Sequence, residues 1–172
     1  MSAVFYLSAF VAVAATVMVI TRVNAVHALL YFIVSLLSIA LIFFLLGAPF
    51  VAALEVIIYA GAIMVLFVFV IMLLNIGSEA AEKEKQLLSP QLWAGPALLS
   101  AVLLGEFIYV LGHGGARAGG IGIVGPRVVG ISLLTKYVIG LELASMLLLA
   151  GLVGAYHLGR RQEAGRESGE RS

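Results

Sequence analysis

The chain has 172 residues, of which 63% are hydrophobic and 11% charged, and its formal net charge is +1. A soluble domain carries about 25% charged residues, so this chain has too little polar surface to face water and is predicted to be an integral membrane protein. The near-neutral charge gives no indication of a nucleic-acid partner. Because there is no cysteine, disulfides and thiolate-held metal or iron–sulfur centres within these residues are excluded.

The hydropathy pattern predicts five membrane-spanning helices, because five apolar stretches suit a hydrocarbon core of about 30 Å. We read the first as a retained span rather than a cleaved signal. Asn24 is the expected N-cap of the second span, and residues 47–49 form a tight connection to the third. The expected spans cover residues 3–20, 25–46, 51–75, 92–111 and 133–157. The sequence thus predicts an all-α membrane bundle over residues 1–158 and a polar, disordered tail over 159–172.

Basic residues are unequally divided between the two sides of this arrangement. Seven of the ten fall on the side that holds the first loop, the polar loop at 77–91 and the tail, and three fall on the other side. The positive-inside rule therefore predicts a cytoplasmic C-terminus and an N-terminus outside. The seven are Arg22, Lys83, Lys85, Arg160, Arg161, Arg166 and Arg171, and the three are Arg117, Arg127 and Lys136.

The third span, from Leu54 to Asn75, is apolar except for a polar group near its start. Glu55 and Tyr59 are four residues apart, so they share a helix face and can hydrogen-bond to each other or hold waters between them. Glu55 is either a proton-carrying group in an apolar setting or a rim residue that reaches back to water. Gly61, between two alanines, either admits a neighbouring helix or lets the backbone leave α geometry.

Two further acids lie inside predicted spans. Glu142 is near the middle of the fifth span, where exposure to lipid would cost about 3 kcal/mol or more, so we expect a buried acid that faces protein or water. A neutral, hydrogen-bonded structural role is the alternative for Glu142. Nothing around Glu106 in the fourth span suggests a pathway, and we interpret it as structural.

The histidines form no visible metal-ligand cluster, because His27, His113 and His157 fall in different segments.

Three motifs occur in order along the chain: NAVHALL at residues 24–30, ALEVIIYAGAIMVLFVFVIMLLN at 53–75 and ELASMLLLAGL at 142–152. They resemble the subunit J family of bacterial NADH-quinone oxidoreductase, respiratory complex I, whose mitochondrial counterpart is chain 6. The resemblance covers residues 1–160 and has five spans in the same order. Ala25 stands where the family often has proline, and Glu106 matches no family motif.

The resemblance implies a membrane-arm subunit with no active site, cofactor or metal of its own. NADH, FMN, iron–sulfur clusters and quinone would be held by other subunits of the complex. The partners would be the other membrane-arm subunits, the quinone-site subunits and the lipid bilayer, without nucleic acid. The family also implies the bacterial inner membrane, with a periplasmic N-terminus.

The family's third span holds a π-bulge, and conversion of the bulge to regular α-helix is proposed to make or break a water wire. If this is carried over to the present sequence, Glu55 and Tyr59 are polar side chains that line a path for protons and water. Gly61 is then the flexible point of the gate. Val65 and Phe67 are apolar neighbours whose packing determines whether water enters the path.

The sequence therefore predicts a gating subunit that couples quinone reduction to proton pumping in a proton-translocating NADH:quinone oxidoreductase. One alternative is a membrane subunit of a multi-chain cation/proton antiporter, whose chains are related to those of complex I. Another is a purely structural scaffold, in which Glu55 and Glu142 hold helices together. A stand-alone transporter is disfavoured, because no internal repeat is visible.

Overall fold

The computed structural model describes residues 2–22, 24–74, 90–113 and 122–169, and all the regular elements within these ranges are helices. Five helices are long and apolar enough to cross a membrane, which confirms the predicted all-α, five-span class. They are Ala3–Thr21, Ala25–Leu45, Pro49–Leu73, Trp93–Gly112 and Val138–Arg160. Residues 75–89 and 114–121 lie outside the described residues, and with them most of the predicted polar loop at 77–91.

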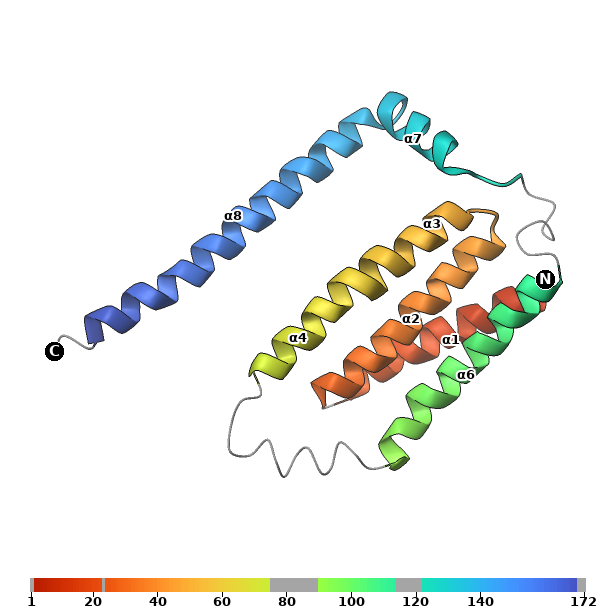
Figure 1. Ribbon diagram of the computed structural model, residues 1–172, viewed down its shortest axis with the longest axis horizontal. Helices are drawn as coiled ribbons and strands as arrows, with labels where there is room; N and C mark the ends of the chain where they lie inside the picture. Colours follow the sequence, from red (N-terminus) through yellow and green to blue (C-terminus); the bar gives the residue numbers. More distant parts are fainter. Residues whose placement is uncertain (1, 23, 75–89, 114–121, 170–172) are drawn as a thin grey trace. The chain divides into compact units, whose positions relative to one another are not determined.

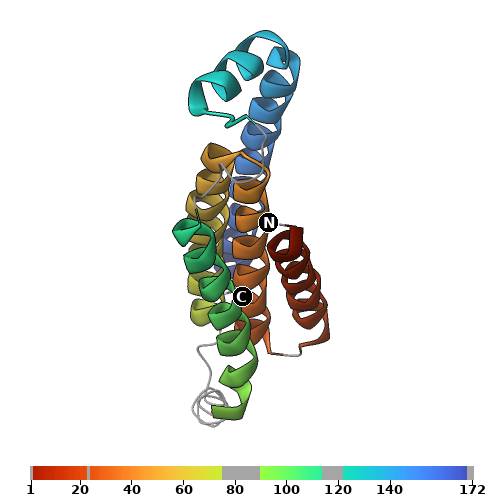
Figure 2. The same ribbon diagram turned by 90° about the vertical axis from the view of Figure 1, so that its right-hand side faces the viewer.

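Contacts within the chain divide it into two units, Met1–Gly125 and Pro126–Ser172. In the first unit, α2 (Ala25–Leu45) packs against α1 (Ser2–Thr21), α6 (Pro90–Gly112) and the third span. Figures 1 and 2 show these helices running alongside one another. The third span is built from three consecutive segments: α3 (Pro49–Leu54), the π-helix η1 (Glu55–Ile63) and α4 (Met64–Leu74).

The second unit contains α7 (Pro126–Thr135) and α8 (Val138–Gly169). The prediction that the fifth span starts at Leu133 was wrong, because α7 ends in a turn and the spanning helix begins at Val138. The backbone N–H groups of Lys136 and Tyr137 both donate to the Ser132 carbonyl at 3.0 Å. Apolar residues on both sides hide this turn from a hydropathy average. α8 continues to Gly169, and the division between a membrane domain and a tail at residue 158 stays a prediction.

The predicted cap and turn around α2 are confirmed. The Asn24 side chain accepts hydrogen bonds from the backbone N–H groups of Val26 and His27, which would otherwise have no partner at the start of the helix. At the other end, Gly47 has φ of 81°, a left-handed conformation that glycine adopts without a Cβ clash. Pro49 then starts α3 at a position where its missing N–H costs nothing. This tight turn sets α2 and the third span antiparallel.

The core of the first unit lies between α1, α2 and α6. Its buried apolar side chains are Val11, Ala15, Val34, Leu41 and Leu103. Small residues let α6 approach α2 closely at one point, because a Cβ placed on Gly95 would overlap the hydroxyl of Tyr31. These contacts hold α1, α2 and α6 together as a three-helix block, and the third span packs on its α2 side.

Candidate functional site

The third span leaves α-helical geometry over nine residues, from Glu55 to Ile63. At the end of this π-helix the backbone N–H of Met64 bonds to the carbonyl of Tyr59, five residues earlier, where an α-helix would reach back four. π-segments are mostly single turns and occur frequently at functional sites. The bulge expected near Tyr59 and Gly61 is therefore confirmed, and it is longer than one turn.

Gly61 allows this geometry because it has no side chain. A Cβ built on Gly61 would lie 3.3 Å from the carbonyl oxygen of Val56, which is closer than an ordinary van der Waals contact. The crowding atom belongs to the backbone of the same π-segment, so it cannot move aside as a flexible side chain would. Any larger residue at position 61 would therefore act on the π-helix itself.

The polar side chains of the π-helix are partly accessible within this chain. Glu55 is half-buried, and Tyr59 is 48% exposed. Within the described ranges, no hydrogen bond joins Glu55 to Tyr59 or pairs either of them with another side chain. Val65 and Phe67 on α4 are exposed as well. The predicted path residues thus lie on one short stretch of the third span, with room for water or a neighbouring subunit.

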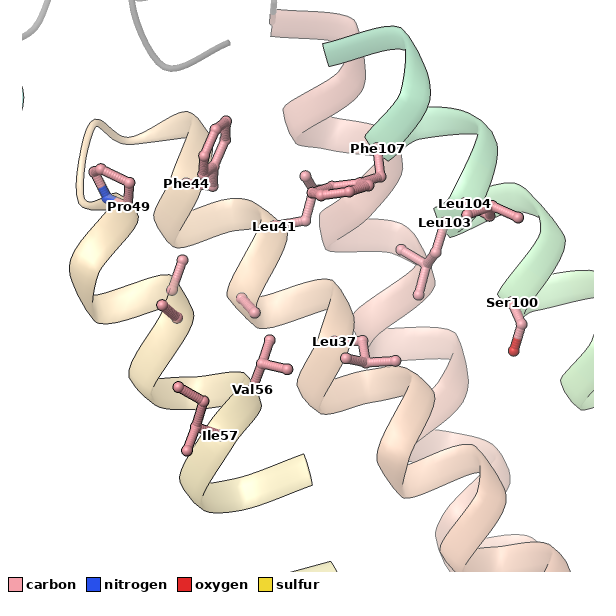
Figure 3. A pocket seen from close by; sticks show the side chains of 13 residues that line it. Leu37, Leu41, Phe44, Pro49, Val56, Ile57, Ser100, Leu103, Leu104 and Phe107 are labelled. Carbon is pink, nitrogen blue, oxygen red and sulfur yellow. The ribbon is translucent and has the colours of Figure 1, made fainter. Parts of the chain in front are cut away.

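An apolar hollow of about 600 Å³ lies on another side of the π-helix, between α2, the third span and α6. Figure 3 shows Val56 and Ile57 of the π-helix lining it, opposite Leu104 and Phe107 of α6. Ser100 is its one hydroxyl-bearing lining residue. A cavity needs several polar partners to hold ordered water, so this hollow is suited to repacking of apolar side chains rather than to a water path.

The acids outside the third span differ sharply from each other. Glu142 lies on the exposed surface of α8 within its own unit, so its expected burial remains a prediction that depends on neighbours outside that unit. Glu106, which the sequence suggested was merely structural, is buried and hydrogen-bonded to Ser8 of α1. Its partner is 98 residues away in sequence, so no local motif could have indicated the contact.

Metal ligation has no candidate in the described part of the chain. No group of three or more His, Asp or Glu side chains there could hold a metal ion. His27 is buried at the start of α2, and His113 stacks on Tyr109 with ring centroids 4.2 Å apart. The ionisable side chains of the π-helix are Glu55 and Tyr59, and both lie within the segment that departs from α-geometry.

Five membrane-crossing helices and a π-helix within the third define a multi-pass membrane protein. Residues 15–158 match the sequence family described as NADH-ubiquinone/plastoquinone oxidoreductase chain 6. The chain therefore belongs to the chain 6 family of NADH-ubiquinone/plastoquinone oxidoreductases.

The relatives that carry the name NADH-quinone oxidoreductase subunit J include proteins from three different bacteria. The one from Pseudomonas aeruginosa is 57% identical over 158 residues, which cover 91% of this chain and 95% of the relative. The one from Escherichia coli K12 is 53% identical over 171 residues, covering 94% and 88%. The one from Buchnera aphidicola of Schizaphis graminum is 45% identical over 163 residues, covering 95% and 100%.

Proposed function

We propose that this chain is the membrane subunit that couples quinone reduction to proton translocation in NADH-quinone oxidoreductase, and that its third span is the gate. The observation that carries the proposal is the nine-residue π-helix from Glu55 to Ile63, in which a Cβ at position 61 would crowd the Val56 carbonyl. We propose that this segment can relax to α-geometry, and Glu55 and Tyr59 both lie within it.

The gate would work by rotation of side chains. Conversion of π-turns to α-turns moves backbone hydrogen bonds from five residues back to four. An α-helix has 3.6 residues per turn. Each one-residue change of register therefore rotates the helix segment that follows the π-turn by roughly 100° about the axis, relative to the segment that precedes it. Tyr59 would then change its position relative to Val65 and Phe67, and the path beside Glu55 would be wetted or dried.

The remaining parts of this function follow from the same family. We propose that the chain itself is non-catalytic, and that NADH, FMN, iron–sulfur clusters and quinone are bound by other subunits. The absence of cysteine supports this for the clusters, whose irons are held by thiolates. The partners would be membrane-arm and quinone-site subunits, which would cover the exposed side chains of Tyr59, Val65 and Phe67.

We further propose that the protein lies in the bacterial inner membrane with a periplasmic N-terminus and a cytoplasmic C-terminus. The excess of Lys and Arg on the side of the first loop, the polar loop and the tail supports this orientation. Cysteines introduced at Ser2 and at Ser172 test it with an impermeant thiol reagent on intact cells. Labelling at Ser2 alone is expected, and labelling at Ser172 alone would reverse the orientation.

The decisive test of the gate is Gly61→Leu in the assembled complex. We expect NADH-driven proton pumping in inverted membrane vesicles to be lost, because the leucine side chain would drive the Val56 carbonyl out of the π-geometry. The matched control is Gly105→Leu, because a Cβ on Gly105 meets nothing within 4 Å. Assembly is checked by native electrophoresis with an NADH-oxidation stain. Normal pumping in assembled Gly61→Leu would refute the gating role.

A further inference from the structure

A buried carboxyl group lies where α1, α2 and α6 meet, away from the π-helix. Glu106 of α6 is 6% exposed, and Ser8 of α1 and Ser38 of α2 are both 0% exposed. Ser8 Oγ lies 2.5 Å from Glu106 Oε2, and Ser38 Oγ donates to the Ser8 backbone carbonyl at 2.7 Å. Three helices that are distant in sequence therefore build one enclosed polar site.

The hydrogen-bond count at this site indicates where the proton is. Ser8 Oγ has one proton but two short oxygen contacts, to Glu106 Oε2 and, at 2.9 Å, to the Val4 carbonyl. A carbonyl oxygen can only accept, and an ionised Glu106 could also only accept. If Glu106 is the neutral acid, its O–H donates to Ser8 and Ser8 donates to Val4. Both contacts are then complete hydrogen bonds.

The second carboxyl oxygen supports the same assignment. Glu106 Oε1 is buried and has no hydrogen-bond partner, and no basic side chain in the described ranges pairs with Glu106. An ionised carboxylate buried without a cation, with one oxygen unbonded, is far more costly than a neutral acid with an unbonded carbonyl oxygen. The enclosure therefore favours the protonated form.

Among the described residues, no other ionisable group on the neighbouring helices lies where it would favour the ionised form of Glu106. On α1, Tyr6 is 70% exposed, and on α6 itself Tyr109 is half-exposed and stacked on His113. On α2, Tyr31 and His27 precede Ser38 by two and three helical turns, so they lie roughly 10 and 16 Å farther along the helix. Arg22 is at that distant end too, over the ring of Tyr31. Across the apolar hollow, the third span presents Val56 and Ile57, and Glu55 is not among the lining residues.

Apolar side chains close the site along α6. Val110 is four residues beyond Glu106, on the same helix face, and it is fully buried. Leu103, three residues before Glu106, is also buried. Because α6 ends at Gly112, Val110 lies between the carboxyl group and the nearer end of the helix. We therefore take Val110 as the side chain that separates Glu106 from water at that end.

We propose that Glu106 is a proton-binding site separate from the third span, which holds one proton as a neutral acid and releases it only when water passes Val110. On release, the proton moves to that water and one negative charge stays on the carboxyl group. This role is independent of the π-helix gate, and it assigns a function to an acid that lies outside the motifs of the third span.

The next hydroxyl groups along α1 and α2 do not extend the site into a conducting wire. Thr16 and Ser35 lie 2.9 Å from each other, and both reach the Ala12 carbonyl, at 2.8 and 3.2 Å. Among the residues that the structure describes, no hydrogen bond joins this pair to Ser8 or Ser38. The site therefore stores a proton near one end of the unit rather than carrying it across the membrane.

The test is infrared spectroscopy of the purified, assembled complex at neutral pH. We expect the C=O stretching band of a protonated carboxylic acid in the parent, and loss of that band in Glu106→Gln, whose amide can still donate to Ser8. Ser8→Ala keeps Glu106 and should shift the band, because the hydrogen bond to the hydroxyl is removed. A parent-minus-Glu106→Gln difference in the carboxylate stretching region instead would overturn the proposal.

The closure by Val110 is tested by transfer of the complex into heavy water. The acid band shifts when its proton is replaced by deuterium, so the time course reports water access. Val110→Ala should make this shift faster than in the parent, and Ile108→Ala, on the exposed face of α6, should leave it unchanged. An equal rate in the parent and Val110→Ala would refute closure by Val110. None of these readouts requires pumping, so they are unaffected if the gate proposal fails.

Discussion

The third span and the three-helix block of α1, α2 and α6 use polar groups in opposite ways. In the π-helix, Glu55 and Tyr59 are accessible and have no hydrogen-bond partner within the described chain. In the block, Ser8, Ser38 and Glu106 are buried, and each is hydrogen-bonded to a residue on a helix other than its own. A polar group that is free of partners can change them, whereas one enclosed by partners fixes the packing around it. The first arrangement suits a moving part and the second a frame.

The backbone reinforces this contrast. The three helices of the block, α1, α2 and α6, are assigned as α-helix throughout. The third span departs from α-geometry over nine residues and borders an apolar hollow of about 600 Å³. A hollow gives Val56 and Ile57 space to repack, which a close-packed interior would not. Substitutions in the third span should therefore affect pumping with assembly intact, and substitutions at packing residues of the block, such as Gly95 and Ser38, should affect assembly with pumping per electron intact.

The largest expected effect is at Gly61, where side-chain size can be graded. Gly61→Leu should abolish proton pumping, and Gly61→Ala should reduce it only in part, because its single Cβ meets the Val56 carbonyl at 3.3 Å. The measurement is the number of protons pumped per NADH oxidised in inverted vesicles, which distinguishes the two variants. Equal pumping by Gly61→Ala and Gly61→Leu would mean that crowding of this carbonyl is not what controls the gate.

The next effect is at the contact between α2 and α6. Gly95→Ala should destabilise the block by about 1–3 kcal/mol, because its Cβ would overlap the Tyr31 hydroxyl and force an overpacked contact. Tyr31→Phe removes that hydroxyl, so the double variant should recover much of the lost stability. The yield of assembled complex and its thermal midpoint report the change. A double variant as unstable as Gly95→Ala alone would show that the hydroxyl is not the obstacle.

A smaller effect is expected at the start of α2. Asn24→Ala should cost about 1 kcal/mol, because the N–H groups of Val26 and His27 lose their acceptor. Asn24→Asp, which keeps an acceptor oxygen at this position, is the matched control and should stay near the parent. The measurement is the thermal midpoint of the complex at constant detergent and lipid. A loss shared by both variants would point to another role for Asn24.

The smallest effect is expected at the hydroxyl between α2 and α1. Ser38→Ala should cost about 0.6 kcal/mol, the average of interhelical hydrogen bonds measured in a membrane protein. It should leave pumping per NADH unchanged, because the hydrogen bond of Ser38 joins α2 to α1 and does not involve the third span. A marked loss of pumping in well-assembled Ser38→Ala would remove the distinction between the frame and the moving span.

Much of the fold was open to prediction from local sequence. Apolar run length indicated the five spans, Asn24 the cap of α2, and Gly47 with Pro49 the turn that follows. The π-bulge came from resemblance rather than from composition, since an apolar stretch with one glycine is equally compatible with a straight helix. The turn between α7 and α8 escaped prediction because apolar residues flank it on both sides.

The sequence by itself determined the class of protein, its family and the stretch that holds the candidate gate. Each of these depends on residues close together in the chain, whose hydropathy and motif order can be read directly. Only the tertiary structure distinguished Glu106 from the other acids. The reason is that burial and hydrogen bonding of a carboxyl group depend on what other helices bring to it, here Ser8 from 98 residues away.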